Sequence, residues 1–152
     1  MVYPIPEKPK KVYRDVMIGS ASKDENGRYT NGIPGDQTGK EVWILNWYDQ
    51  SWTSILRPTD AALAEKIASI CEDACENNNI GYSQSSRNTL LAQAKLVNYD
   101  LSKVAPCNCD CSSFVSTCCV CAGLRESLFF PGGNGCTTWT IADACLQSGK
   151  FI

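Results

Sequence analysis

The chain has 152 residues, of which 43% are apolar and 20% charged, and its formal net charge is -2. This length suits one domain, and the composition is typical of a globular protein rather than of a disordered or membrane chain. The near-neutral charge gives no general attraction to nucleic acid or anionic lipid, so neither is expected as a partner. No stretch approaches the ~20 apolar residues that span a bilayer, so membrane insertion is not expected.

Two residue counts restrict the chemistry. The sequence has no histidine, and imidazole is the only side chain whose unperturbed pKa lies near neutrality. A Ser-His-Asp triad, a Cys-His dyad or a histidine-ligated metal site therefore cannot be completed within these 152 residues. The sequence also has ten cysteines, six of them between Cys107 and Cys121.

The first 14 residues are predicted to form an extended arm, followed by one domain at residues 15–152. Three prolines and three lysines occur within the first 11 residues, which favours an extended, solvated segment. No apolar run follows that could act as a signal peptide, so we expect synthesis in the cytoplasm without one. Reduced thiols are the expectation in that compartment.

Strands and loops are predicted between Val16 and Pro58, with short apolar runs at 16–18, 42–45 and 55–56. Beyond Pro58 the apolar spacing becomes helical. A first helix has Thr59 or Asp60 as N-cap and ends at the asparagines 77–79. Its expected apolar stripe is Leu63, Ile67, Ile70 and Ala74.

Three further helices are predicted. The second begins near Ser85 or Ser86 and ends before Pro106. The third runs from Cys111 to about Ala122 with Asp110 as N-cap. The fourth begins near Thr138, after a glycine-rich loop at 131–135. The expected buried faces are Leu90, Leu91, Ala94 and Val97 for the second helix, and Trp139, Ala142 and Leu146 for the fourth.

The most distinctive segment is Cys109-Asp110-Cys111-Ser112-Ser113-Phe114-Val115. If Asp110 caps a helix, Cys111 lies in the first turn, where unpaired N–H groups and the helix dipole favour an anion. A thiolate in such a position is a usable nucleophile, although the charge of Asp110 opposes it. The alternative is a small buried cysteine beside an ordinary cap.

Residues Asp110 to Val115 resemble the nucleophile motif of the NlpC/P60 and CHAP peptidoglycan hydrolases, which are papain-like cysteine enzymes. Further segments are similar, in the same order, to phage and prophage endolysins of that class. They are Gly19-Ser20-Ala21-Ser22, the run from Gly35 to Val42, Trp47-Tyr48, Arg57-Pro58, the run from Asn79 to Gln84, the run from Arg87 to Leu90 and the run from Ser148 to Phe151. The resemblance covers nearly all of the chain after the arm.

The resemblance implies an α+β fold with a papain-like helical half, and cleavage of a peptide or amide bond of bacterial peptidoglycan through a thioester at Cys111. It implies no cofactor. Asp110 would cap and orient, and Tyr82 would line the cleft. Asp36, Gln37 and Ser112 would contact substrate. For Tyr82 an aromatic packed between helices is an equal alternative, and for Asp36 and Gln37 a β-turn is the favoured one.

One part of the pattern is missing. In such enzymes the general base is a histidine on a strand that follows the nucleophile helix, and this chain has no histidine. We therefore expect a domain that is incomplete at its C-terminus and lacks the β-barrel half, with the base supplied by a C-terminal segment or a second chain. Helices that lack a sheet to pack against leave apolar surface exposed, so we expect association or marginal stability.

Two other functions remain open. The first is a non-catalytic peptidoglycan-binding protein. The second is a small zinc protein whose ligands are Cys107, Cys109, Cys118 and Cys121. Against zinc, Cys118 and Cys121 lie on one face of the predicted third helix with Phe114, which favours packing in the core. Free thiols packed as small hydrophobes are also expected at Cys71 and Cys75, because a disulfide along one helix has poor geometry.

Overall fold

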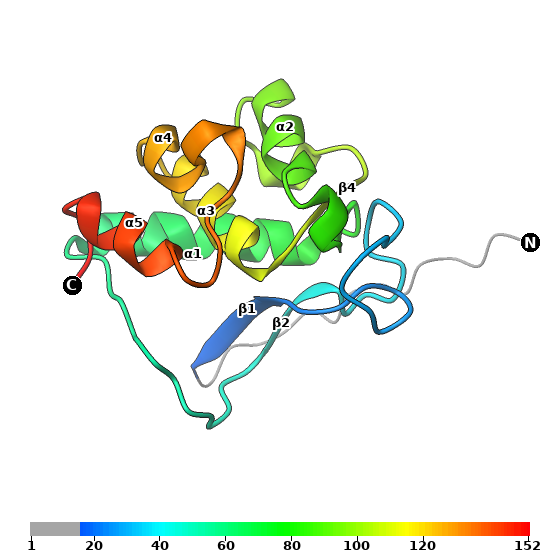
Figure 1. Ribbon diagram of the computed structural model, residues 1–152, viewed down its shortest axis with the longest axis horizontal. Coiled ribbons are helices and arrows are strands. Elements are labelled where there is room, and N and C mark those ends of the chain that lie inside the picture. The colour runs from blue at the N-terminus through cyan, green and yellow to red at the C-terminus, as the bar shows by residue number, and fades with distance from the viewer. Residues whose placement is uncertain (1–15) are drawn as a thin grey trace, which may run out of the picture.

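The computed structural model describes residues 16–152, so the arm predicted at residues 1–14 lies outside the described residues. This part of the chain has the predicted α+β composition, with five α-helices and two two-stranded sheets (Figure 1). None of the helices found there has the length and apolar character needed to cross a membrane.

A hairpin opens the described chain. Strand β1 (Met17–Ala21) pairs antiparallel with β2 (Val42–Asn46), in a register that places Gly19 opposite Ile44. These strands confirm two of the apolar runs that were predicted to be extended. The run at 55–56 is not a strand, and Ile55 is 54% exposed.

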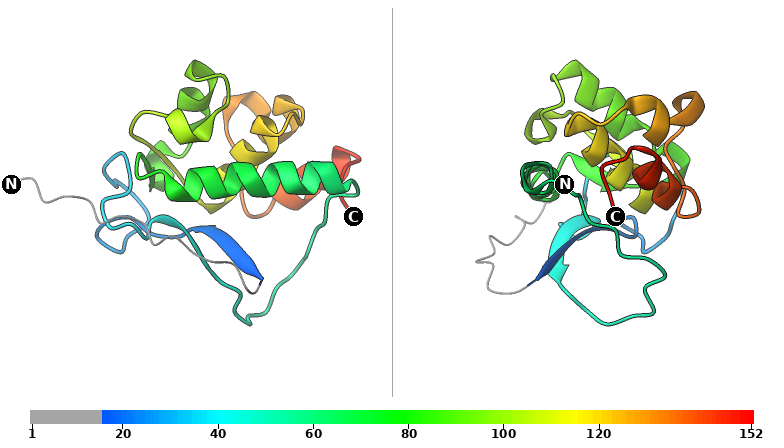
Figure 2. Two further views of the ribbon diagram at one scale, coloured as in Figure 1. Left: turned by 180° about the vertical axis from the view of Figure 1, so that it is seen from behind. Right: turned by 90° about the vertical axis from the view of Figure 1, so that its left-hand side faces the viewer.

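Helix α1 (Ala61–Glu76) confirms the first predicted helix. The side chain of Asp60 accepts hydrogen bonds from the backbone N–H groups of Ala62 and Leu63, and Asn77 is the C-cap. The hairpin lies on one side of α1 and the shorter helices lie on the other, as both views in Figure 2 show. Helix α1 therefore separates the hairpin from most of the helical part.

A parallel pair of strands was not predicted. Strand β3 (Ile80–Tyr82) pairs with β4 (Cys107–Cys109), which places Tyr82 opposite Cys109. The connection contains α2 (Thr89–Leu96), which begins later than predicted because residues 84–86 form a separate 3-10 turn. Leu90, Leu91 and Ala94 are buried, as expected. Three-residue strands carry too little periodicity to be recognised from sequence.

Helix α3 (Cys111–Cys121) has Asp110 as its N-cap, which confirms the third predicted helix. It lies between two groups of buried side chains. Phe114 and Cys118 pack with residues of α1, β3 and β4, whereas Cys119 and Val120 pack with the C-terminal helices. Burial on both sides fixes this helix firmly in the core.

The C-terminal region differs from the prediction. Helix α4 (Glu126–Phe129) was missed, and α5 (Ile141–Gln147) begins later than Thr138. Its buried residues are Ala144 and Cys145, whereas Trp139 is 90% and Leu146 51% exposed, so the predicted buried face is wrong. Helix α5 packs Ala144 and Cys145 into the cluster that contains Phe129 and Phe130. This tertiary contact overrides the local pattern.

Candidate functional site

Cys111 is the first residue of α3 and directly follows the β4 strand and the capping residue Asp110. It is exposed, whereas the other nine cysteines of the sequence are buried or partly buried. Within residues 16–152 the backbone N–H groups of Cys111 and Ser112 have no acceptor, as expected in the first turn of a helix. The site therefore combines an accessible thiol with two unpaired donors.

Asp110 anchors this helix end through a capping box. Its Oδ1 accepts a hydrogen bond from the Ser113 backbone N–H at 2.8 Å, and Ser113 Oγ accepts one from the Asp110 N–H at 2.9 Å. Burial alone would raise the pKa of Asp110, but hydrogen bonds from Arg87 and Ser113 outweigh it and lower that pKa. Asp110 is therefore held as a carboxylate.

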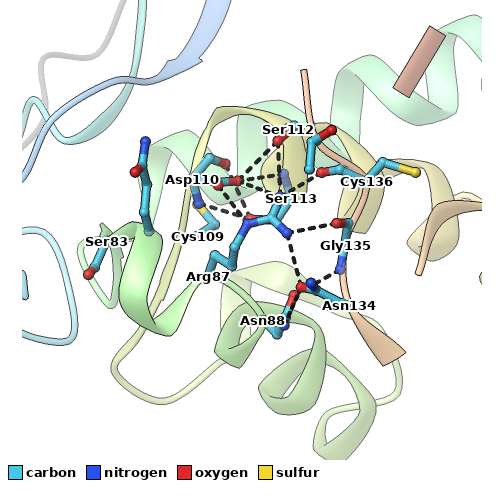
Figure 3. A network of polar contacts seen from close by, with 12 residues as sticks. Ser83, Arg87, Asn88, Cys109, Asp110, Ser112, Ser113, Asn134, Gly135 and Cys136 are labelled. Carbon is cyan, nitrogen blue, oxygen red and sulfur yellow. Dashed lines mark hydrogen bonds and ion pairs between the residues drawn. The ribbon is translucent and has the colours of Figure 1, made fainter. Parts of the chain in front are cut away.

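Arg87 supplies the positive charge that Asp110 needs. Its Nε lies 2.6 Å from Asp110 Oδ2 and its Nη2 lies 3.2 Å from Oδ1, in a two-pronged ion pair (Figure 3). The side chains are only 14% and 10% exposed. Because the guanidinium compensates the charge of Asp110, the capping residue no longer opposes an anion at the helix start.

The same guanidinium fixes a loop beside the start of α3. Arg87 Nη1 donates to the carbonyl of Gly135 at 2.7 Å, and Nη2 donates to the carbonyl of Cys136 at 2.5 Å. Asn88 adds a contact, since its Oδ1 accepts from the Gly135 N–H at 3.0 Å (Figure 3). Nothing local in the sequence links Arg87 to a carboxylate 23 positions away, so this role was not predicted.

Two of the predicted substrate-binding residues lie close to Cys111 but are buried. Ser112 is 6% exposed, and its hydroxyl accepts from Arg87 and donates to Asp110. Tyr82 is 2% exposed and packs in the core. Burial raises the pKa of Tyr82 to about 12, and the neighbouring Cys111 and Asp110 add to this effect.

Asp36 and Gln37 lie elsewhere. Their loop contacts the beginning of β4, where the Gly35 N–H donates to the Cys107 carbonyl at 3.0 Å, whereas Cys111 follows the other end of that strand. Asp36 is fully buried and accepts from backbone N–H groups, including that of Gly39 at 2.6 Å. The Gln37 side chain donates to carbonyls of its own loop. These contacts hold the loop in its conformation, and a role of Asp36 and Gln37 in substrate contact stays a prediction.

Glu41 joins this loop to the site and was not singled out in the sequence. It is 1% exposed, and its carboxylate accepts from the N–H of Gln37 at 2.7 Å and from that of Tyr82 at 3.0 Å. Burial raises the pKa of Glu41 to about 7, although the two hydrogen bonds lower it. A buried carboxyl group thus contacts the backbone of β3 at Tyr82.

The four cysteines of the zinc alternative all belong to one core cluster or pack against it. Cys107 and Cys109 each point a thiol at a backbone carbonyl 3.6 Å away, and Cys118 lies in the core. Burial raises the pKa of Cys107 and of Cys121 to about 12. Across the described range 16–152, no three Cys, Asp or Glu side chains are grouped so that they could hold a metal ion.

Fold and site together define a small α+β domain with one exposed thiol on the capped end of a buried helix. A family model described as "Endolysin-like domain" matches residues 18–152, and the chain belongs to this family. The predicted resemblance to endolysins is confirmed at that level. No curated protein and no solved structure is significantly similar to the chain.

Proposed function

We propose that the protein is a phage or prophage lysin that hydrolyses bacterial peptidoglycan, with Cys111 as the nucleophile of a cysteine peptidase or amidase of the papain-like NlpC/P60 or CHAP type. The observation that carries the proposal is the exposed Cys111 thiol at the capped start of α3 in an endolysin-like domain. In this proposal the protein is made in the cytoplasm and acts at the cell wall.

The chemistry begins with attack of Cys111 Sγ on the carbonyl carbon of a peptide or amide bond. The carbonyl oxygen becomes an oxyanion, to which the free N–H groups of Cys111 and Ser112 donate. Loss of the protonated amine leaves a thioester, and water then hydrolyses it. One such donor contributes ~10² to 10³ in rate.

The surrounding residues position this thiol. Arg87 and Asp110 hold the helix start and neutralise each other. Ser112 and Tyr82 pack beneath the surface and support the site, since both are buried. Asp36 and Gln37 stabilise the conformation of their own loop through hydrogen bonds.

The thiol also needs a proton acceptor. The 152 residues contain no histidine, and the carboxylate of the adjacent residue, Asp110, is occupied by Arg87 and Ser113. We infer that the base comes from outside these residues, either from a further segment of the polypeptide or from a second chain.

Chemical rescue tests both parts of the proposal. Purified peptidoglycan is incubated with the protein, with and without imidazole, and newly released amino groups are quantified. We expect slow release that imidazole accelerates at least about tenfold, and loss of this release in Cys111→Ala. Cys121→Ser, at the far end of α3, is the matched thiol control and should behave like the wild type. Release that persists in Cys111→Ala would rule out the cysteine mechanism.

The lack of histidine favours one alternative, a protein that binds peptidoglycan without cleaving it. Co-sedimentation with insoluble peptidoglycan separates the two functions. If the protein only binds, the wild type and Cys111→Ala should both be retained in the pellet, and no amino groups should be released even in imidazole.

A further inference from the structure

A second group of thiols lies on the opposite side of α3 from the loop that Arg87 holds. Cys71 of α1 packs against the core cluster that contains Cys75 of its own helix and Cys118 of α3. Cys75 and Cys118 are buried, with 2% and 3% exposed, whereas Cys71 is only partly buried. Helices α1 and α3 pack against each other (Figure 1), so Cys71 and Cys118 lie on two helices that share an interface.

One of these residues, Cys71, is partly exposed and borders a hollow. A hollow of about 350 Å³ lies between the hairpin and α1, and its lining includes Gly19, Ile44 and Cys71. A Cβ atom on Gly19 would lie 2.2 Å from Cys71 Sγ, so only glycine leaves room for the sulfur there. A small reagent that enters the hollow can therefore contact Cys71, whereas Cys118 is buried and is not among the residues that line the hollow.

The two thiols also differ in acidity. Hydrogen bonds from Cys118 and Cys75 lower the pKa of Cys71, although burial opposes this shift. The hydrogen bond with Cys71, together with burial, raises the pKa of Cys118. These opposite shifts favour the thiolate on Cys71 over the thiolate on Cys118.

We propose that Cys71 and Cys118 form a redox-active dithiol, which low-molecular-weight disulfides oxidise to a disulfide that links α1 to α3. The Cys71 thiolate attacks one sulfur of the reagent, forms a mixed disulfide and releases one thiolate. Cys118 then attacks the Cys71 sulfur and gives up its proton, and the second reagent thiol leaves. Two protein thiols are oxidised and one disulfide is reduced to two thiols.

Neighbouring thiols fit this role less well. Cys75 is four positions from Cys71 on the same helix, where disulfide geometry is poor. Cys119 and Cys145 are also hydrogen-bonded to each other, but they are 2% and 5% exposed and lie in the other cluster. We expect that pair to oxidise later. The inference is independent of the proposed hydrolase, because Cys118 lies about two helical turns from Cys111.

The test uses the full chain carrying Cys111→Ser, so that the exposed thiol does not react. The folded protein is treated with oxidised glutathione, and the products are mapped by peptide mass spectrometry over time. We expect a Cys71–Cys118 link to appear first and to raise the melting temperature by roughly 5 °C or more, reversibly with dithiothreitol. Cys121→Ser is the matched control and should leave this link unchanged.

Single replacements separate the two roles. In Cys118→Ser we expect glutathione to accumulate as a mixed disulfide on Cys71. In Cys71→Ser we expect Cys118 to stay reduced and to become alkylated only after unfolding. A first link between Cys119 and Cys145, a link between Cys71 and Cys75, or no oxidation of Cys71 in the folded protein would each overturn the proposal.

Discussion

Arg87 holds the parts of the site together, although the sequence alone assigned it no role. Its guanidinium contacts Asp110, Ser112 and the backbone of the loop at 134–136, so one side chain joins the segment before α2, the start of α3 and that loop. Arginine suits this task because its planar fork offers five donors in fixed directions.

Removing Arg87 tests this role. We expect Arg87→Ala to reduce the free energy of unfolding by about 3 kcal/mol, because a buried carboxylate and two carbonyls lose their partner. Arg87→Lys should recover only part of it, since an ammonium cannot make the two-pronged contact. Urea unfolding measures both. Lys95→Ala is the control: its ion pair with Glu126 is well exposed, so a loss above about 0.5 kcal/mol there would be unexpected.

Glu41 should make stability depend on pH. Its pKa rises from 4.5 to about 7 on folding, so between these pH values the folded protein binds more protons than the unfolded chain. Stability contributed by this group is therefore full below about pH 4.5 and falls as the pH rises toward 7. Urea unfolding at pH 5 and pH 7.5 should show this decrease. In Glu41→Gln the decrease should shrink, whereas exposed Glu65→Gln should keep it.

The elements that hold the site are its shortest ones. Strands β3 and β4 have three residues each, yet β4 leads directly into α3 and β3 carries Tyr82 beside it. Gly81 permits this arrangement, because a Cβ atom there would lie 2.2 Å from the Gly35 carbonyl oxygen. Close backbone packing thus joins the loop of Asp36 to the strand pair.

Two aspartate caps allow a matched comparison between helices. Asp60 caps α1 in an exposed position, whereas Asp110 caps α3 while buried against Arg87. We expect Asp60→Ala to cost about 1 kcal/mol, as ordinary caps do. Asp110→Ala should cost about 3 kcal/mol, because it also leaves the guanidinium of Arg87 without its counter-charge. Equal losses in chemical denaturation would show that the ion pair adds nothing to the cap.

The ends of the helical part are tied together by backbone contacts. Residues 57–59 pair with residues 150–152, through hydrogen bonds that include Arg57 N–H to the Ile152 carbonyl at 2.8 Å. Phe151 packs against the same cluster as Phe129. This contact joins the long segment after the hairpin to the end of the described chain.

Two neighbouring residues test that closure. We expect Phe151→Ala to lower the free energy of unfolding by about 2 kcal/mol, because it removes a partly buried ring. Ile152→Ala should change it by less than about 0.5 kcal/mol, since that side chain is 75% exposed. Thermal unfolding followed by circular dichroism provides the comparison. A similar loss in both variants would indicate that the backbone pairing alone matters.

Local sequence determined the long elements. Helix α1, helix α3 and their aspartate caps were predicted because periodicity and capping act within a few residues. The same local pattern placed Cys111 in the first turn of α3. The association expected from unpartnered helices stays a prediction, and so does the origin of the missing base.

Tertiary structure decided what surrounds that cysteine. The Arg87–Asp110 pair, the β3–β4 pair and the buried face of α5 depend on contacts between residues far apart in the chain. No single segment carries a signal for them, because their energy arises only when separate elements exclude water together. The sequence alone thus identified a cysteine at a helix start, and packing determined that it is exposed, oriented and beside a neutralised cap.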